Sequence, residues 1–359
     1  MKFLSIDQHI SPISDLRRIF NDLGHTIHEY SLSERARVIG RVPADIPQLN
    51  GEGWRDVIKQ KKFKEFCDFY AEDFASYDAI ICCYPPIFSW LYSCCNKPIL
   101  IHIPIRYEYG VDDNAVLWQE FNDYLRYGVD NGKIFLAANS LYDKHYTEGF
   151  LNRRVEHISS YCEYTGMSYN PVRQHFLTYS SFQVNDKSDL LYDKKLLQVG
   201  HEFQEVGNHK GIVHFPYQVS TMSMFEQYCA NIPMFYPTKK YLLELYKEKH
   251  PVIQQASWNK TYGRANLKSI IPSTHEHDPN DYEDLPAITH WLQYADFYSE
   301  FSCANYFDNK DELRAYLTMP EDHLMFMSWR MREHNQARKE LIYDKWRKLL
   351  EEVKHGLSS

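Results

Sequence analysis

This chain of 359 residues lacks the motifs that identify several common protein classes. No stretch approaches the ~18 consecutive apolar residues that a membrane-spanning helix needs. The first strand-like run, residues 2–6, is followed by no Gly-x-Gly-x-x-Gly, and the chain has no P-loop, Gly-x-Ser-x-Gly or His-Glu-x-x-His. Glycine and proline are scarce, at 14 and 16 residues. These absences argue against a dinucleotide enzyme of the usual kind and against a disordered or fibrous chain.

The charge balance is acidic, with 40 Lys and Arg against 48 Asp and Glu and a formal charge of −8. Such a chain repels phosphate polymers and acidic lipids, so we predict no nucleic-acid partner and no membrane-surface binding. Aromatic residues are abundant, with 28 Tyr, 20 Phe and 7 Trp. We assign most of them to hydrophobic cores.

The eight cysteines form no Cys-x-x-Cys pattern. Cys82 and Cys83 are adjacent in an apolar run, as are Cys94 and Cys95. The chain also begins without the basic and apolar regions of a secretory signal. We therefore expect reduced structural thiols and a cytoplasmic protein.

The first part of the chain alternates strand-like and helix-like segments. Apolar runs predict strands at 2–6, 25–30, 79–84, 98–105 and 134–138, and helical spacing predicts helices at 11–24, 54–74 and 118–127. Continuous apolar strands between helices are typical of a parallel sheet covered on both faces. We predict a Rossmann-like α/β domain over residues 1–160.

The rhythm is lost near Gly166, where we place the domain junction. Apolar runs resume at 176–182, 196–199, 212–215 and 232–236, with a helix at 241–247. We predict a second Rossmann-like domain over 161–320 and a long C-terminal helix in 321–359 that packs back on the first domain. The acidic segment 273–284 is expected to be a loop, and its His275, Glu276, His277 and Asp278 are not assigned to a metal site.

The segment 212–237 reads IVHFPYQVSTMSMFEQYCANIPMFYP. A strand ending at Pro216 is followed by a polar turn and a helix that begins near Met224 and carries Glu226 in its first turn. Backbone N–H groups at a helix N-terminus bind phosphate, and a carboxylate accepts hydrogen bonds from a ribose diol. The alternative is an ordinary Ser or Thr helix cap followed by a Glu that stabilises the helix.

This segment resembles the donor-binding segment of GT-B glycosyltransferases, in which two Rossmann-like domains face a cleft. The matching positions are Pro216, Gln218, Glu226, Asn231 and Pro233, with Gln218 where the family has a Glu and Asn231 where it has a Gly. The resemblance implies that Glu226 holds the nucleotide ribose and that Gln218 touches the sugar. Together with the polar turn and a candidate cation for the diphosphate, this predicts a set of donor-binding residues: Lys210, Tyr217, Gln218, Ser220, Thr221, Met222, Ser223 and Glu226.

The resemblance implies transfer of a sugar from a nucleotide-diphosphate donor, a UDP- or GDP-sugar, to a hydroxyl of a glycan or other acceptor. The chain contains no Asp-x-Asp, the usual metal anchor of metal-dependent glycosyltransferases, so we expect metal-independent transfer with no cofactor. A nucleotide-sugar epimerase, a phosphorylase and a non-catalytic glycan-binding protein are the alternatives.

Asp7 and His9 follow the first predicted strand, where ligands of a doubly wound sheet bind. An imidazole is suited to take a proton from an acceptor hydroxyl, and we predict His9 as general base with Asp7 orienting it. A loop histidine beside a helix-capping aspartate is the alternative. Lys239 and Lys240, together with Lys210, are candidates to neutralise the diphosphate.

Overall fold

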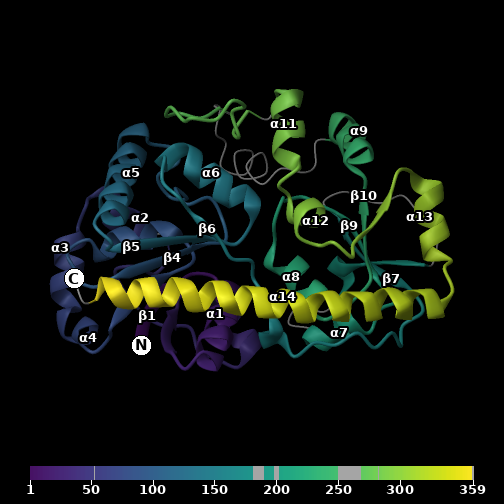
Figure 1. The fold of residues 1–359 in the computed structure, drawn as a ribbon, viewed down its shortest axis with the longest axis horizontal. Helices are drawn as coiled ribbons and strands as arrows, with labels where there is room; N and C mark the ends of the chain where they lie inside the picture. Colours follow the sequence, from purple (N-terminus) through teal and green to yellow (C-terminus); the bar gives the residue numbers. More distant parts are fainter. Residues whose placement is uncertain (52, 181–189, 198–201, 250–267, 282, 358–359) are drawn as a thin grey trace. The chain divides into compact units, whose positions relative to one another are not determined.

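The computed structural model describes the chain except for residues 52, 181–189, 198–201, 250–267, 282 and 358–359 (Figure 1). The described residues form two compact units. Unit 1 comprises Met1–Ser160, Ile270–Glu276 and Leu341–Ser359, and unit 2 comprises Tyr161–Ser269 and His277–Glu340. Each unit contains one parallel sheet with helices, which confirms the prediction of two Rossmann-like α/β domains.

The sheet of unit 1 has the strand order β2-β1-β3-β4-β5-β6, and every neighbouring pair is parallel. Its strands are β1 (Lys2–Asp7), β2 (Thr26–Ser31), β3 (Ala79–Cys82), β4 (Ile99–Ile103), β5 (Ile134–Ala138) and β6 (Glu156–His157). Its helices include α1 (Ile10–Asp22), α2 (Gly53–Lys59), α3 (Phe63–Phe69), α4 (Ala71–Ala75), α5 (Ala115–Asp130) and α6 (Leu141–Leu151), with 3-10 turns η1 (Glu34–Ile39) and η2 (Pro86–Tyr92).

The central strands of unit 1 are buried on both faces, as their continuous apolar sequences predict. Every residue of β3 and β4 is buried. The single helix predicted over 54–74 is wrong, because the structure divides this segment into α2, α3 and α4. Lys61 has a φ of 53° between α2 and α3, a left-handed conformation that ends a helix. Neither Gly nor Pro marks that break in the sequence.

The sheet of unit 2 has the order β11-β10-β9-β7-β8, again parallel throughout. Its strands are β7 (Phe176–Ser180), β8 (Leu191–Asp193), β9 (Ile212–Phe215), β10 (Met234–Pro237) and β11 (Asn305–Phe307). Its helices include η3 (Glu163–Thr165), η4 (Lys194–Leu196), α7 (Phe203–Gly207), α8 (Met222–Cys229), α9 (Lys239–Lys249), α11 (Leu285–Leu292), α12 (Asp296–Ser299) and α13 (Lys310–Leu317). The predicted apolar run 196–199 contains no described strand, and residues 198 and 199 lie outside the described residues.

Helix α14 (Glu321–Gly356) is the long yellow helix of Figure 1. Its residues up to Glu340 belong to unit 2, whereas those from Leu341 belong to unit 1. In unit 1 the Trp346 ring is fully buried and lies 5.3 Å from the ring of Phe20 and 5.6 Å from that of His102. The last turns of α14 therefore complete the core of unit 1. No described helix is both long and apolar enough to cross a membrane.

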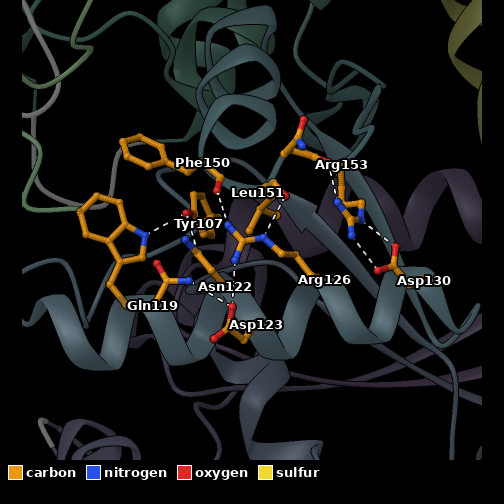
Figure 2. Close-up of polar contacts among 11 residues, drawn as sticks. Tyr107, Gln119, Asn122, Asp123, Arg126, Asp130, Phe150, Leu151 and Arg153 are labelled. Carbon is orange, nitrogen blue, oxygen red and sulfur yellow. Dashed lines mark hydrogen bonds and ion pairs between the residues drawn. The ribbon is translucent and has the colours of Figure 1, made fainter. Parts of the chain in front are cut away.

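Polar side chains join α5 to the residues that follow β4 and α6 in unit 1 (Figure 2). Arg126 donates from Nε to the carbonyl of Leu151 at 3.0 Å and from a terminal nitrogen to that of Phe150 at 2.9 Å, which satisfies the end of α6. Tyr107 donates to Asn122 at 2.8 Å, and Trp118 donates to Tyr107 at 2.8 Å. These bonds fix the chain just beyond the end of β4.

Both sheets reverse their strand order at one position. In unit 1, β2 lies on one side of β1 and β3 on the other. In unit 2, β8 lies on one side of β7 and β9 on the other. Ligands of doubly wound sheets bind beyond the carboxyl ends of the strands at such a position. The topology therefore directs attention to the residues that follow β1 and β3 in unit 1, and to those that follow β7 and β9 in unit 2.

Candidate functional site

The predicted donor segment follows β9, one of the two strands at the reversal point of unit 2. Strand β9 ends at Phe215 and α8 begins at Met222, two residues earlier than predicted. The loop between them is anchored by Val219, which is fully buried and whose carbonyl accepts a 3.0 Å hydrogen bond from the N–H of Asp296 at the start of α12. Residues 181–189, which follow β7, lie outside the described residues.

The N-terminus of α8 has no side-chain cap. Thr221 occupies the cap position, but its side chain accepts no hydrogen bond from the helix; its hydroxyl instead lies 3.1 Å from that of Ser223. The Ser220 side chain is 5% exposed, and its hydroxyl has no hydrogen-bond partner among the described residues. The alternative of an ordinary Ser or Thr cap is therefore wrong here. The helix end retains backbone N–H groups and hydroxyls, which are groups that bind anions in proteins.

Glu226 lies in the second turn of α8, so its predicted position in the first turn is wrong. The helix starts at Met222, which leaves no acidic residue in the first turn. The partly buried Glu226 carboxylate accepts a hydrogen bond through Oε1 from the hydroxyl of Tyr164 in η3. The neighbouring Glu163 is held by Lys339 at 2.8 Å. Sequence reasoning missed Tyr164, because 62 residues separate it from Glu226.

The departure from the family pattern at Asn231 has a structural explanation. Asn231 follows α8 with a φ of 61°, the left-handed conformation that glycine adopts most readily and that asparagine tolerates best among the other residues. Its side-chain oxygen accepts a 2.9 Å hydrogen bond from Asn335. Asn231 therefore provides the left-handed turn after α8 at the position where the family pattern has a glycine.

Of the other predicted donor residues, Tyr217 and Gln218 lie beside α8 and Lys210 does not. Tyr217 is 42% exposed, and Gln218 is partly buried. Lys210 precedes β9, and its carbonyl accepts a 2.8 Å hydrogen bond from Tyr169. The start and the end of a strand lie at opposite edges of a sheet, so six residues at ~3.3 Å each put Lys210 roughly 20 Å from Pro216. The assignment of Lys210 to donor binding is wrong.

Lys239 and Lys240 follow β10 and begin α9, so both lie at the carboxyl edge of the sheet. The Lys239 ammonium sits 5.4 Å from the centre of the Tyr298 ring. Both lysines therefore lie at the same edge of the unit 2 sheet as the N-terminus of α8, and their predicted role in neutralising the diphosphate stays a prediction.

In unit 1, His9 and Asp7 lie at the end of β1, beside the reversal point. The His9 ring packs against Tyr84, which follows β3, with 5.3 Å between ring centres. Its Nδ1 accepts a 3.3 Å hydrogen bond from the N–H of Ser11 and so caps α1. Burial, then the charge of Arg35, lowers the pKa of His9 to about 4, so the ring is neutral at pH 7. A neutral ring whose Nδ1 accepts carries its proton on Nε2.

The expected orientation of His9 by Asp7 is wrong. The Asp7 carboxylate accepts from the backbone N–H of His9 at 3.0 Å and from the Ser31 hydroxyl at 3.2 Å, but it forms no described bond with the imidazole. Asp7 is fully buried; its burial and the nearby Glu29 raise its pKa well above the ordinary value. Asp7 therefore fixes the backbone at His9, and the outer nitrogen of His9 is a hydrogen-bond donor.

A buried charged cluster follows β4 and β5 and includes Arg106 and Ser140, for which the sequence favours structural loop roles. The Arg106 guanidinium lies 3.5 Å from the centre of the Tyr146 ring and donates to the Tyr142 hydroxyl at 2.7 Å. Tyr146 donates to Glu108 at 2.5 Å. Ser140, which caps α6, donates to Asp143 at 2.7 Å. In the sequence, this cluster is indicated by polar residues that directly follow the apolar runs of β4 and β5.

Burial determines the protonation of this cluster. It raises the pKa of Glu108 to about 7 and that of Asp143 to about 6, against the opposing positive charge of Arg106. Both carboxyl groups keep one oxygen without a hydrogen-bond partner among the described residues. Groups with such shifted pKa values gather at functional sites, as well as in structural ion networks.

The described residues contain no group of three or more His, Cys, Asp or Glu side chains that could hold a metal ion. The histidines of the acidic loop belong to different units. In unit 1, Nε2 of His275 lies 3.2 Å from the Tyr146 carbonyl. In unit 2, the His277 ring lies 4.8 Å from that of His290.

No protein-family model and no curated protein matches the chain. Among solved structures, the chain is similar to the glycotransferase of kitacinnamycin, with 11% identity, a TM-score of 0.46, and 97% of this chain and 98% of that one covered. It is also similar to CalG4, the calicheamicin glycosyltransferase, with 10% identity, a TM-score of 0.41 and the same coverage of both chains. A third structure is the spinosyn rhamnosyltransferase SpnG complexed with thymidine diphosphate, at 10% identity and a TM-score of 0.37 over 72% of this chain and 88% of that one.

Proposed function

We propose that the chain is a GT-B glycosyltransferase that moves a sugar from a nucleotide-diphosphate donor, a UDP- or GDP-sugar, to a hydroxyl of a glycan or other acceptor. The observation that carries the proposal is the uncapped N-terminus of α8 at the strand-order reversal of unit 2. Two Rossmann-like units in one chain, and the donor segment that follows β9, agree with it.

The donor diphosphate binds at the N-terminus of α8. The helix dipole, the backbone N–H groups and the hydroxyls of Ser220, Thr221 and Ser223 supply positive potential and donors. The diphosphate gains negative charge as the bond to the sugar breaks, and donors fixed beforehand stabilise that charge without a metal ion. The Glu226 carboxylate, which Tyr164 holds through Oε1, accepts hydrogen bonds from the ribose hydroxyls.

The acceptor binds at the carboxyl edge of the unit 1 sheet. There His9 donates from Nε2 to an oxygen of the substrate, because its Nδ1 is engaged by the cap of α1. This role replaces the general base predicted from sequence. As the bond between the sugar and the diphosphate breaks and the bond to the acceptor oxygen forms, the acceptor proton passes to the departing diphosphate.

Calorimetric titration with UDP, GDP and TDP tests the donor site. Loss of a hydrogen bond to a charged group costs about 1.5–3 kcal/mol, so Glu226→Ala should weaken binding of the preferred nucleotide at least about tenfold. Glu340→Ala, which removes an exposed glutamate from α14, is the matched control and should bind as the wild type does. Unchanged nucleotide affinity in folded Glu226→Ala would overturn the ribose assignment.

Turnover separates this proposal from the other activities. Nucleotide release from the donor sugar should require a hydroxyl acceptor and should proceed with chelator present. Isomerisation of the donor sugar without an acceptor would indicate an epimerase, and dependence on inorganic phosphate would indicate a phosphorylase. A folded protein that binds glycans but none of the nucleotides would contradict the proposal.

A further inference from the structure

The first part of α14, within unit 2, presents large apolar side chains to solvent. Met325, Phe326 and Trp329 are 47%, 57% and 52% exposed. The rings of Phe326 and Trp329 stack, with centres 5.8 Å apart and planes 25° apart. The opposite side of the same helix is buried through Leu324, Ser328 and Met331 and needs no further cover. Isolated exposed apolar residues are common, but a stacked pair with a third neighbour forms a patch of the kind that marks an interface.

Two opposite charges flank this patch symmetrically. Asp322 lies four residues before Phe326 and Arg330 lies four residues after it, so all three share one side of the helix. Both charged residues are exposed, and neither side chain forms an ion pair within the described part of the chain. We call the set Asp322, Met325, Phe326, Trp329 and Arg330 the Phe326 face.

We propose that the Phe326 face binds the Phe326 face of a second copy of this chain, with the two α14 helices antiparallel about a two-fold axis at Phe326. In that arrangement each Asp322 meets the other copy's Arg330, so the ion pair forms twice. Phe326 meets its own counterpart, and Met325 and Trp329 cover the flanks. A patch with acid and base equally spaced about an apolar centre is complementary to itself, which a two-fold interface requires.

A lipid surface fits the same patch less well. Helices that lie on membranes carry Lys and Arg along the polar flanks of the apolar face. Here Asp322 is within the face, Glu321 and Glu333 are exposed beside it, and the chain has a formal charge of −8. These acids outnumber the exposed Arg330 and Arg332, so the face lacks the excess of positive charge that anionic lipid headgroups attract.

The expected dimer is weak. A large aromatic side chain buries about 150–250 Å² when fully covered, and roughly half of that is still exposed on each of Phe326 and Trp329. Three half-exposed side chains supply far less than the ~800 Å² per partner of a standard interface. The association should therefore be measured by sedimentation equilibrium of the full chain, from micromolar to several hundred micromolar.

Charge reversal gives the decisive test. Asp322→Arg alone and Arg330→Asp alone each place like charges together twice, and each should weaken dimerisation at least about tenfold. A mixture of the two single variants should restore association, because every pair across the mixed interface is then opposite. The double variant Asp322→Arg/Arg330→Asp should also associate as the wild type does. Restoration in the mixture distinguishes a direct contact from damage to the helix.

Truncation variants test the apolar centre. Phe326→Ala should weaken association on the order of tenfold to a hundredfold, as expected for a central aromatic residue. Leu341→Ala is the matched control, because Leu341 is 55% exposed on α14 but lies outside the Phe326 face, and it should leave association unchanged. A wild type that stays monomeric throughout, or single charge variants that dimerise normally, would overturn the proposal. Binding of the monomeric wild type to phosphatidylserine vesicles, lost in Phe326→Ala, would assign the face to lipid.

Discussion

Unit 1 buries charged side chains where its strands end, whereas unit 2 places hydroxyls and a helix terminus there. At the end of β1 and beyond β4 and β5 of unit 1 lie the buried side chains of Asp7, Arg106, Glu108 and Asp143. Beyond β9 of unit 2 lie Ser220, Thr221 and Ser223, with Glu226 one turn into α8. Two sheets with the same type of strand-order reversal therefore carry different chemistry. In unit 2, the N–H dipoles of a helix terminus are groups that can bind an anion without a buried charge. In unit 1, buried ionisable groups make the protonation of the site depend on pH.

The largest expected effect concerns the charged cluster of unit 1. Arg106→Met removes the guanidinium whose positive charge opposes the raised pKa values of Glu108 and Asp143, and it leaves both carboxyl groups buried. Breaking a buried ion network costs about 3–5 kcal/mol of unfolding free energy, to be measured in urea at pH 8.

The loss should shrink at pH 5.5. The pKa values of about 7 for Glu108 and about 6 for Asp143 mean that both carboxyl groups are then mostly protonated. Arg314→Met, which removes an exposed arginine of α13, should cost little at either pH. Equal losses for the two variants would show that unit 1 does not depend on its buried charges.

The next largest effect concerns His9. His9→Asn keeps a good helix cap for α1 but removes the Nε2 donor, so turnover should fall about a hundredfold while nucleotide affinity is unchanged. His9→Ala should lose as much turnover and about 1 kcal/mol of stability as well, because the cap is also lost. Steady-state rates, calorimetry and urea unfolding measure the three quantities. Full turnover in His9→Asn would leave His9 with a capping role alone.

The third prediction concerns acid stability in unit 2. His214 is fully buried, and its Nε2 lies 2.7 Å from Gln227; burial lowers its pKa to about 3. The unfolded chain binds a proton there near pH 6.5 while the folded chain does not, so stability falls as pH falls below 6.5. Between pH 7 and pH 5 this one group should remove about 2 kcal/mol.

Substitution isolates that contribution. In His214→Phe, which keeps an aromatic ring beside Tyr236, the drop in stability between the two pH values should be smaller by about the same amount. In unit 1, Glu108 and Asp143 act in the opposite direction, because their raised pKa values favour the folded state at low pH. An unchanged pH dependence in the variant would contradict the assignment.

The smallest effect concerns Tyr164, a positioning residue for Glu226. Tyr164→Phe removes one hydrogen bond to the carboxylate and should weaken nucleotide binding roughly fivefold. In a Glu226→Ala background the same change should have no further effect, because the group that Tyr164 holds is absent. An equal loss in both backgrounds would mean that Tyr164 contacts the nucleotide by itself.

The central strands were predictable because burial on both faces gives a continuous apolar run. The edge strands β8 and β11 were missed, since their residues are only partly buried and their sequences Leu-Tyr-Asp and Asn-Tyr-Phe carry no such run. The segment after β9 was predictable from its turn residues and its spacing. Its partner Tyr164 was not, because contacts between distant positions have no local sequence pattern.

Two further outcomes depended on tertiary structure. Lys210 was assigned by its nearness in sequence to the donor segment, although the direction of β9 carries it to the opposite edge. The Glu108–Asp143 pair depends on β4 and β5 being neighbours, which brings together residues 35 positions apart. The order of strands in the sheet, which brings these two carboxyl groups together, has no local sequence pattern.

The division of α14 between the units bears on how the protein is made. Unit 1 contains residues from Met1 onward, yet its core includes Trp346, which packs against Phe20 and His102. Residues 161–340 must therefore leave the ribosome before Trp346 does, a delay on the order of ten seconds or more at cellular rates of synthesis. Until then Phe20 lacks the Trp346 ring that packs against it in the folded chain. The described residues of unit 2 end at Glu340, so we infer that the second unit along the chain is the first to be completed.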